Sequence, residues 1–279
     1  MTLSMQLHTA ALQGEFELVQ DLLAQGANPN DLNKRHQNAL FSALFLPVLH
    51  SALMKQNKIK IFHLLSEQIH NLAQQDESGD TILQVVAASD FANLVPSLLE
   101  ASPELPCIAN NQGHYPIHTA ILNAQPETVA SLLAQPNVST LRDDNGWTPL
   151  HYAACYGAKD ILDLCIAAEP NLEVVDLLGQ TPLMLAVSFG RLDMVQALIQ
   201  AGANLHCRNL SGFTLLHQAV HHVHPEIVSW LLANTDIKPG IKDKDHHTAL
   251  ALGKLEGRTE FTKLESLLPS RGEGARKGG

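Results

Sequence analysis

Aromatic residues, cysteine and charge are all scarce in this sequence of 279 residues. Aromatic residues make up 5% of the chain and charged residues 16%. A core with so few rings is built from leucine, alanine, isoleucine and valine, a mixture that favours packed helices. The four cysteines show no CxxC spacing, which indicates reduced thiols in a cytoplasmic protein.

Several segments that would place the chain in another class are also missing. No apolar run approaches the ~18 residues of a membrane span, and no basic region followed by a long apolar stretch opens the sequence. The net charge is −10 and basic runs are absent, so we expect no nucleic-acid partner. A Gly-rich phosphate loop and a GxSxG elbow are absent too. The sequence predicts a soluble protein.

The chain does contain a repeat. One apolar residue near the head of each copy marks the series, which runs Leu7, Leu49, Leu83, Ile117, Leu150, Leu183, Leu216 and Leu250. The step is 33 residues from Leu150 to Leu183 and 34 from Leu216 to Leu250. A period of this length is typical of solenoid proteins.

Each copy has the same internal order. A polar turn with glycine precedes a short apolar segment, where Thr148 is expected to cap a helix and Pro149 to occupy its first turn. Gly157 and Gly190 are expected to end this first helix in a left-handed conformation. The apolar residues of segment 192–204 recur at spacings of three and four, which predicts a second helix with one buried face.

These motifs resemble the ankyrin repeat family, whose repeats carry TPLHxAAxxG and a closing GA(D/N) turn. TPLHYAA at 148–154 with Gly157 matches the first motif, and 202–204 and 26–28 match the second. The resemblance covers residues 5–268. It implies an all-α solenoid of stacked helix–turn–helix units joined by β-turn fingers, in which neighbouring repeats share one core.

The expected domain organisation is one array over residues 1–268, with about eight repeats, a capping repeat at each end and no second domain. Residues 269–279 are expected to be a disordered tail. An insertion within residues 28–54 interrupts the period. Either Leu40 or Leu49 can head the second copy there, and a lengthened first helix that protrudes from the stack would reconcile the two registers.

One histidine slot recurs in five copies, at His8, His50, His118, His151 and His217. Five repeats do not each need a catalytic base. The neighbouring Cys155 and Cys165 have no adjoining basic pair or helix N-terminus that would lower a thiol pKa. The resemblance implies that this histidine ties the helix start to the neighbouring finger. We therefore predict no catalytic residue and no cofactor.

A second group of histidines lies in HQAVHHVH (217–224) and at His246 and His247. His217 and His221 are four residues apart on one helical face, as metal ligands often are, but no glutamate follows the HExxH pattern. We predict no metal site. The alternative is a metal-dependent or enzyme-like role for the seventh and eighth repeats. It would use His221, His222, His246 and His247.

In the family, partners bind to the concave face formed by the finger tips and the exposed side of the first helices. Of the 2 Trp, 3 Tyr and 8 Phe residues, four fall in these slots. Exposed aromatic clusters are typical of interfaces, although the rings could instead fold inward and pad the fingers. We predict a binding stripe over copies four to seven. Its residues are Trp147, Tyr156, Leu177, Leu178, Phe189, Phe213, His221, His222 and His247.

The function that follows is a non-enzymatic scaffold for protein–protein interaction, which binds a protein or peptide partner. We expect a monomer in the cytoplasm. Because the family is common in eukaryotes and in bacteria that deliver effectors into host cells, one hypothesis is an effector that acts in the host cytosol.

Overall fold

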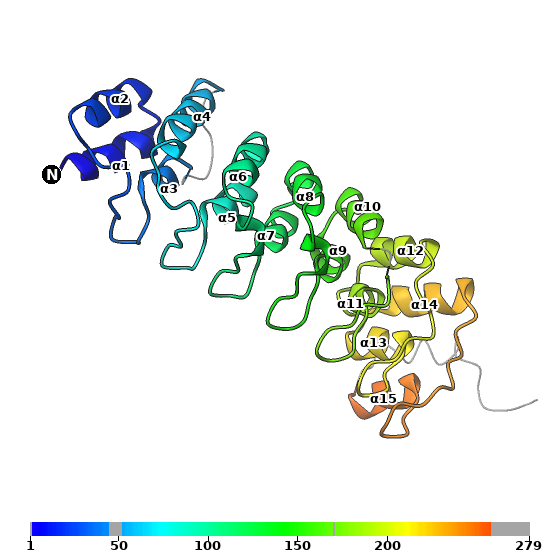
Figure 1. Ribbon diagram of the computed structural model, residues 1–279. Coiled ribbons are helices and arrows are strands. Elements are labelled where there is room, and N and C mark those ends of the chain that lie inside the picture. Colours follow the sequence, from blue (N-terminus) through cyan, green and yellow to red (C-terminus); the bar gives the residue numbers. More distant parts are fainter. Residues whose placement is uncertain (1, 45–51, 170, 258–279) are drawn as a thin grey trace, which may run out of the picture. The chain divides into compact units, whose positions relative to one another are not determined.

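The computed structural model describes residues 2–44, 52–169 and 171–257. The chain divides into two compact units, Met1–Asp144 and Asn145–Gly279. In each unit a short first helix is followed by a second helix, and a projecting finger leads to the next first helix (Figure 1). The prediction of an all-α fold of helix–turn–helix repeats is confirmed. That the two units form one array stays a prediction.

The described residues of the first unit form four such helix pairs. Its first helices are α1 (Leu3–Gln13), α3 (Ala39–Leu44), α5 (Ile82–Ala87) and α7 (Pro116–Leu122). Its second helices are α2 (Phe16–Ala24), α4 (Ala52–Ser66), α6 (Val95–Ala101) and α8 (Pro126–Leu133). Short 3₁₀ turns lie at Ala92–Leu94, Leu105–Cys107 and Val138–Thr140.

The second unit repeats the same plan. Its first helices are α9 (Pro149–Tyr156), α11 (Pro182–Ser188), α13 (Leu215–His221) and α15 (Ala249–Leu255). Its second helices are α10 (Lys159–Ala168), α12 (Leu192–Gln200) and α14 (Pro225–Asn234).

The first helices form the centre of each core. In α11 every residue is buried, because α9 packs on one side of it and α13 on the other. The second helix α12 instead buries one face, through Met194, Val195, Ala197 and Leu198. A helix covered by both neighbours needs no apolar periodicity, whereas one covered on a single side does. Each repeat therefore depends on its neighbours for burial.

The fingers are held by an aspartate or asparagine at their first position. In the sixth repeat Asp176 Oδ1 accepts hydrogen bonds from the backbone N–H groups of Leu178 and Gln180, both at 2.8 Å. Such a side chain fixes a tight turn by replacing a backbone acceptor. The same pair of bonds forms at Asn33, Asp76, Asn110 and Asn209.

Adjacent fingers of the second unit are joined through their second residue. The backbone N–H groups of Leu177, Leu210 and Lys244 each donate to a carbonyl of the preceding finger, at 3.0–3.1 Å. Leu210 also lies against Gly179, where a Cβ atom would stand 3.0 Å from the leucine Cγ. We call these three side chains the tip row, since the ladder of bonds sets them in sequence from finger to finger.

In the fifth and seventh repeats the recurring histidine links the first helix to the next finger. His151 Nδ1 accepts from the backbone N–H of Thr148 at 3.1 Å, and its Nε2 lies 3.1 Å from the Gln180 carbonyl oxygen. Because Nδ1 accepts, the ring proton is on Nε2, which donates to that carbonyl. His217 has the same arrangement, with Nε2 3.0 Å from the His247 carbonyl oxygen.

Gln84 performs the same task without an imidazole. Its Oε1 accepts from the Thr81 backbone N–H at 2.6 Å, and its Nε2 donates to the Ile108 and His114 carbonyls at 3.1 and 3.2 Å. Where this slot makes the link, it uses an acceptor and a donor, and it needs no proton chemistry. The structural interpretation is confirmed for His151 and His217, whereas His50 lies outside the described residues.

Two details of the repeat differ from the sequence-based expectations. Gly190 is left-handed as predicted, with φ +71°, but Gly157 is extended, with φ −67°. The left-handed prediction for Gly157 is therefore wrong. Its lack of a side chain matters for another reason, because a Cβ atom there would stand 2.7 Å from the Ala153 carbonyl oxygen.

The second copy adopts the register headed by Leu40. Asn38 Oδ1 accepts from the backbone N–H of Leu40 at 3.1 Å, at the start of α3, as expected for a helix cap. Phe41 then fills the histidine slot and is fully buried. The competing Leu49 and the tail at 269–279 lie outside the described residues.

We expect His151→Ala to lower the free energy of unfolding by about 1–3 kcal/mol, because it leaves the buried Thr148 N–H and the Gln180 carbonyl without their partner. His151→Gln should recover more than half of that loss, as Gln84 supplies the same two bonds. Urea denaturation measures both variants. Equal losses would show that the slot needs the imidazole ring itself.

Burial lowers the pKa of His217 below its ordinary 6.5. The unfolded chain therefore takes up this proton at a higher pH than the folded chain does. The contribution of neutral His217 to the stability of the fold is complete above about pH 6.5, and it is lost as the pH falls below that value. We expect the urea midpoint of His217→Gln to fall less between pH 7 and 5 than that of the wild type. Parallel decreases would contradict this account.

Candidate functional site

Four aromatic rings meet in the second unit, and we call them the aromatic cluster. They are Trp147 of a finger, Tyr152 and Tyr156 of α9, and Phe189 just after α11. Trp147 lies 5.4 Å from Tyr152 and 6.0 Å from Phe189, and Tyr156 lies 5.2 Å from Phe189, between ring centroids. All three pairs are edge-on, the arrangement that aromatic quadrupoles favour.

The cluster has a buried base and an exposed rim. Tyr156 is 46% exposed and Phe189 42%, whereas Tyr152 is buried and Trp147 is half-buried. The expectation that Trp147 stands exposed at a finger tip is wrong. Its Nε1 donates to Asp176 Oδ2 at 3.2 Å, which draws the ring toward the next finger. The predicted binding stripe did not include Tyr152, because this residue directly follows the histidine slot and lies on the core side of the helix.

Three exposed leucines extend the apolar surface along the finger tips. Leu177 is 67% exposed, Leu178 62% and Leu210 61%. Leu177 and Leu178 were predicted to belong to the binding stripe, and Leu210 adds a third leucine from the next finger. A monomeric protein rarely exposes several large apolar side chains together, so the tips are a candidate contact surface.

Phe213 belongs to a different group of rings. It is half-buried, and its ring contacts are with His217, stacked at 5.5 Å, and with His221 at 5.8 Å. The expected line of four aromatic residues from consecutive repeats is therefore incomplete: Trp147, Tyr156 and Phe189 touch one another, and Phe213 packs within its own repeat.

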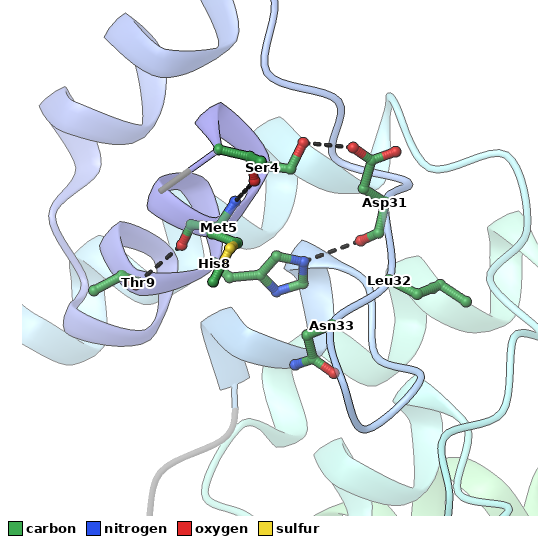
Figure 2. Close-up of a pocket in the computed structure, with 8 residues that line it drawn as sticks. Ser4, Met5, His8, Thr9, Asp31, Leu32 and Asn33 are labelled. Atoms are coloured by element: carbon green, nitrogen blue, oxygen red, sulfur yellow. Dashed lines mark hydrogen bonds between the residues drawn. The ribbon is translucent and has the colours of Figure 1, made fainter.

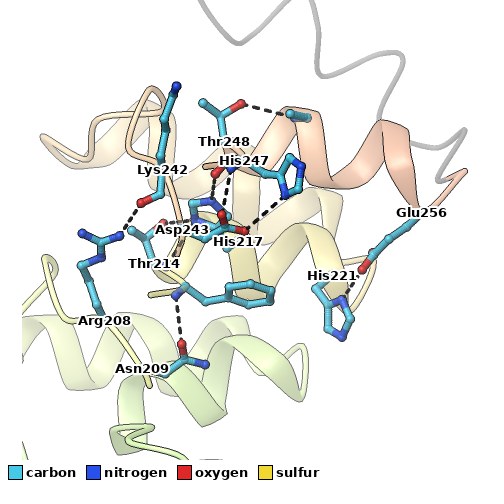
Figure 3. A network of polar contacts seen from close by, with 12 residues as sticks. Arg208, Asn209, Thr214, His217, His221, Lys242, Asp243, His247, Thr248 and Glu256 are labelled. Carbon is cyan, nitrogen blue, oxygen red and sulfur yellow. Dashed lines mark hydrogen bonds and ion pairs between the residues drawn. The ribbon is translucent and has the colours of Figure 1, made fainter. Parts of the chain in front are cut away.

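A buried carboxylate lies beside this second group (Figure 3). Asp243 Oδ1 accepts from the His247 backbone N–H at 2.8 Å, but its buried Oδ2 has no hydrogen-bond partner and lies 4.0 Å from His247 Nδ1. The equivalent Asp176 Oδ2 accepts from Trp147, whose slot in the preceding finger is held by Phe213 here. A phenyl ring has no donor, so this oxygen stays unsatisfied.

The histidines of the seventh and eighth repeats are engaged in structure. His221 Nδ1 lies 2.6 Å from Glu256 Oε1, a contact that joins the ends of α13 and α15 (Figure 3). His246 holds the left-handed position of its finger, with φ +64°, and the exposed His222 packs its ring against His221. Within the described ranges, no group of three or more His, Cys, Asp or Glu side chains could hold a metal ion. The metal-dependent alternative has no support.

The cysteines near the cluster are poorly suited to nucleophilic chemistry. Burial raises the pKa of Cys165 to about 12 and that of Cys207 to about 11, and it also raises the pKa of Cys155. Only a thiolate is an effective nucleophile, and these thiols stay protonated near neutral pH.

A hollow of about 530 Å³ in the first unit brings a serine, a histidine and an aspartate together (Figure 2). Ser4 Oγ donates to Asp31 Oδ2 at 2.5 Å, while His8 Nε2 bonds to the Asp31 backbone carbonyl at 3.0 Å. His8 Nδ1 is bonded to Ser42 Oγ at 2.7 Å. In a catalytic triad the histidine stands between the nucleophile and the carboxylate, which is not the arrangement here.

We expect Phe213→Trp to raise the free energy of unfolding by about 1 kcal/mol, because the indole N–H can donate to Asp243 Oδ2 as Trp147 does to Asp176. The reciprocal control, Trp147→Phe, should lower it by a similar amount. Urea denaturation compares the two. A loss of stability in both variants would mean that ring shape outweighs the hydrogen bond.

Comparisons with known proteins agree with this geometry. A model described as "Ankyrin repeats (3 copies)" matches residues 49–140 and 136–209, "Ankyrin repeats (many copies)" matches 198–252, and "Ankyrin repeat" matches 7–34. The human protein "Transient receptor potential cation channel subfamily A member 1" is 29% identical over 127 residues, which are 46% of this chain and 10% of that protein. The match thus spans a tenth of that relative's length. In the described ranges, no helix is both long and apolar enough to cross a membrane. Since the family models match well over half of its residues, the chain belongs to the ankyrin repeat family.

Proposed function

We propose that the chain is a non-enzymatic scaffold that binds a protein or peptide partner on the finger and first-helix face of its second unit. Ankyrin repeats generally mediate protein–protein interaction. The observation that carries the proposal is the rim of the aromatic cluster. Tyr156 and Phe189 are exposed, yet they are held 5.2 Å apart in a fixed edge-on pair.

Rigidity makes this pair suited to binding. Trp147, which contacts both rings of the pair, is itself held in place: it stacks on His151 and donates a hydrogen bond to Asp176. Rings that are already fixed lose little conformational entropy when a partner covers them. Large aromatic side chains near the centre of an interface commonly provide much of its binding energy.

The padding interpretation fits only part of the cluster. Tyr152 and Trp147 do fill the space between finger and helix, as padding would. Tyr156 and Phe189 leave over 40% of their surface in water. The surface that we assign to the partner consists of this rim together with Leu177, Leu178 and Leu210. Phe213, His221, His222 and His247 stand at its far end.

The cellular setting rests on other grounds. The cytoplasmic location, the monomeric state and the role of an effector in a host cell stay predictions from the sequence and the resemblance.

We expect the double variant Tyr156→Ala/Phe189→Ala to weaken partner binding by ~30-fold or more, since a hot-spot residue costs about 2 kcal/mol when truncated. Stability should fall by only about 0.5–1.5 kcal/mol, because the variant loses the edge-on ring contacts and little other burial. The measurement is the affinity of a peptide selected on the chain from a displayed random library, with urea denaturation of the same samples.

The matched control is Leu18→Ala, which removes an apolar side chain that is 43% exposed on α2 of the first unit. It should leave binding unchanged. A loss of stability that equals the loss of binding would make the rim core padding, and unchanged binding in the double variant would place the interface elsewhere.

A further inference from the structure

We propose that the partner segment is apolar at one end and acidic at the other. This inference rests on the proposed function and names the chemistry of the partner. The apolar end covers the rim of the aromatic cluster and the tip leucines, and the acidic end lies on the fingers of the seventh and eighth repeats.

The first argument is the sequence of side chains along the tip row. Leu177, Leu210 and Lys244 follow one another on successive fingers, each bonded through its backbone N–H to the finger before it. Lys244 also lies against Gly212, where a Cβ atom would stand 3.2 Å from the lysine Cγ. The exposed row therefore changes from apolar to cationic within three neighbouring fingers.

The second argument is the balance of charge on the last two fingers. Exposed cations outnumber exposed carboxylates among the described residues of these fingers: the cations are Arg208, Lys238, Lys242 and Lys244, and the carboxylates are Asp236 and Asp245. Asp236 Oδ1 lies 3.5 Å from His206 Nε2. Asp243 is buried and caps its own turn. The whole chain, by contrast, has a net charge of −10. A cationic patch on an acidic protein favours an acidic partner, since the rest of the surface repels one.

Arg208 gives this patch a fixed geometry. Its Nε donates to the Gly212 carbonyl at 3.1 Å, and its Nη2 donates to the Lys242 carbonyl of the next finger (Figure 3). These bonds hold the guanidinium between two fingers, and they bring the Lys242 backbone to it. The exposed His246, in the finger of the eighth repeat, adds a ring N–H donor.

The test begins with the full chain and a phage-displayed library of random peptides about 12 residues long, which reach ~40 Å when extended. We expect the enriched peptides to combine a group of large apolar residues with at least two acidic residues to one side of it. One enriched peptide is then synthesised, together with a version in which each acidic residue is replaced by its amide.

Lys242→Glu/Lys244→Glu should weaken the acidic peptide by about 10-fold, and the loss should shrink as salt is raised. The same substitutions should leave the amide peptide unchanged. The control Lys34→Glu reverses an exposed lysine at the equivalent tip position of a finger in the first unit, and it should have no effect.

The outcomes separate this inference from the proposed function. Selected peptides could require Tyr156 and Phe189 for binding and yet lack acidic residues, or bind equally well after the Lys242/Lys244 charge reversal. Either result would contradict the acidic end of the partner and would still support the apolar surface. A library with no enrichment over the empty support would overturn both.

Discussion

A hydrogen bond from the first helix to the backbone of the next finger, made in the first, third, fifth and seventh repeats, is the constraint on which the rest of the structure depends. Fingers carry many backbone polar groups and few apolar side chains, so burial alone cannot fix them. The side chain at the third helical position, which has both an acceptor and a donor, makes two hydrogen bonds. It caps its own helix through one atom and holds the neighbouring finger through the other, as His151, His217 and Gln84 all do.

The candidate surface follows from that constraint. Where a finger is tied to the helix before it, and adjacent fingers are joined through their backbones, equivalent slots of adjacent repeats lie side by side. Residues far apart in sequence, such as Tyr156 and Phe189, then come within 5.2 Å. The same arrangement orders Leu177, Leu210 and Lys244 on successive fingers. The repeat supplies a fixed frame, and the chemistry of the surface depends on which side chains fill the slots that the frame leaves open.

Much of the fold could be predicted because its signals are local and repeated. The period, the threonine caps and the structural role of the histidine each appear in several copies, so one copy checks another. The predictions that were wrong concern residues whose conformation depends on a neighbouring residue, and the sequence alone does not show where that neighbour lies. Trp147 is half-buried because Asp176 of the next finger accepts its N–H. Gly157 is required by the nearby Ala153 carbonyl and not by its own φ. Tyr152 belongs to the aromatic cluster, although no feature of the sequence indicated this.

The surface was predicted less completely than the frame for the same reason. Register identified the slots, but the direction of each side chain depends on packing between repeats. Phe213 occupies the same slot as Trp147, yet it has no donor for Asp243 and contacts His217 and His221. Slot identity therefore predicted which residues are near the surface and did not predict which of them touch.

The most direct test of the central claim is the tautomer of the linking histidines, read by ¹⁵N NMR of the imidazole rings in the full chain at neutral pH. The account predicts that His151 and His217 are neutral, with Nδ1 bare and the proton on Nε2, and that this proton exchanges slowly with water. A proton on Nδ1, or a charged ring at this pH, would contradict it.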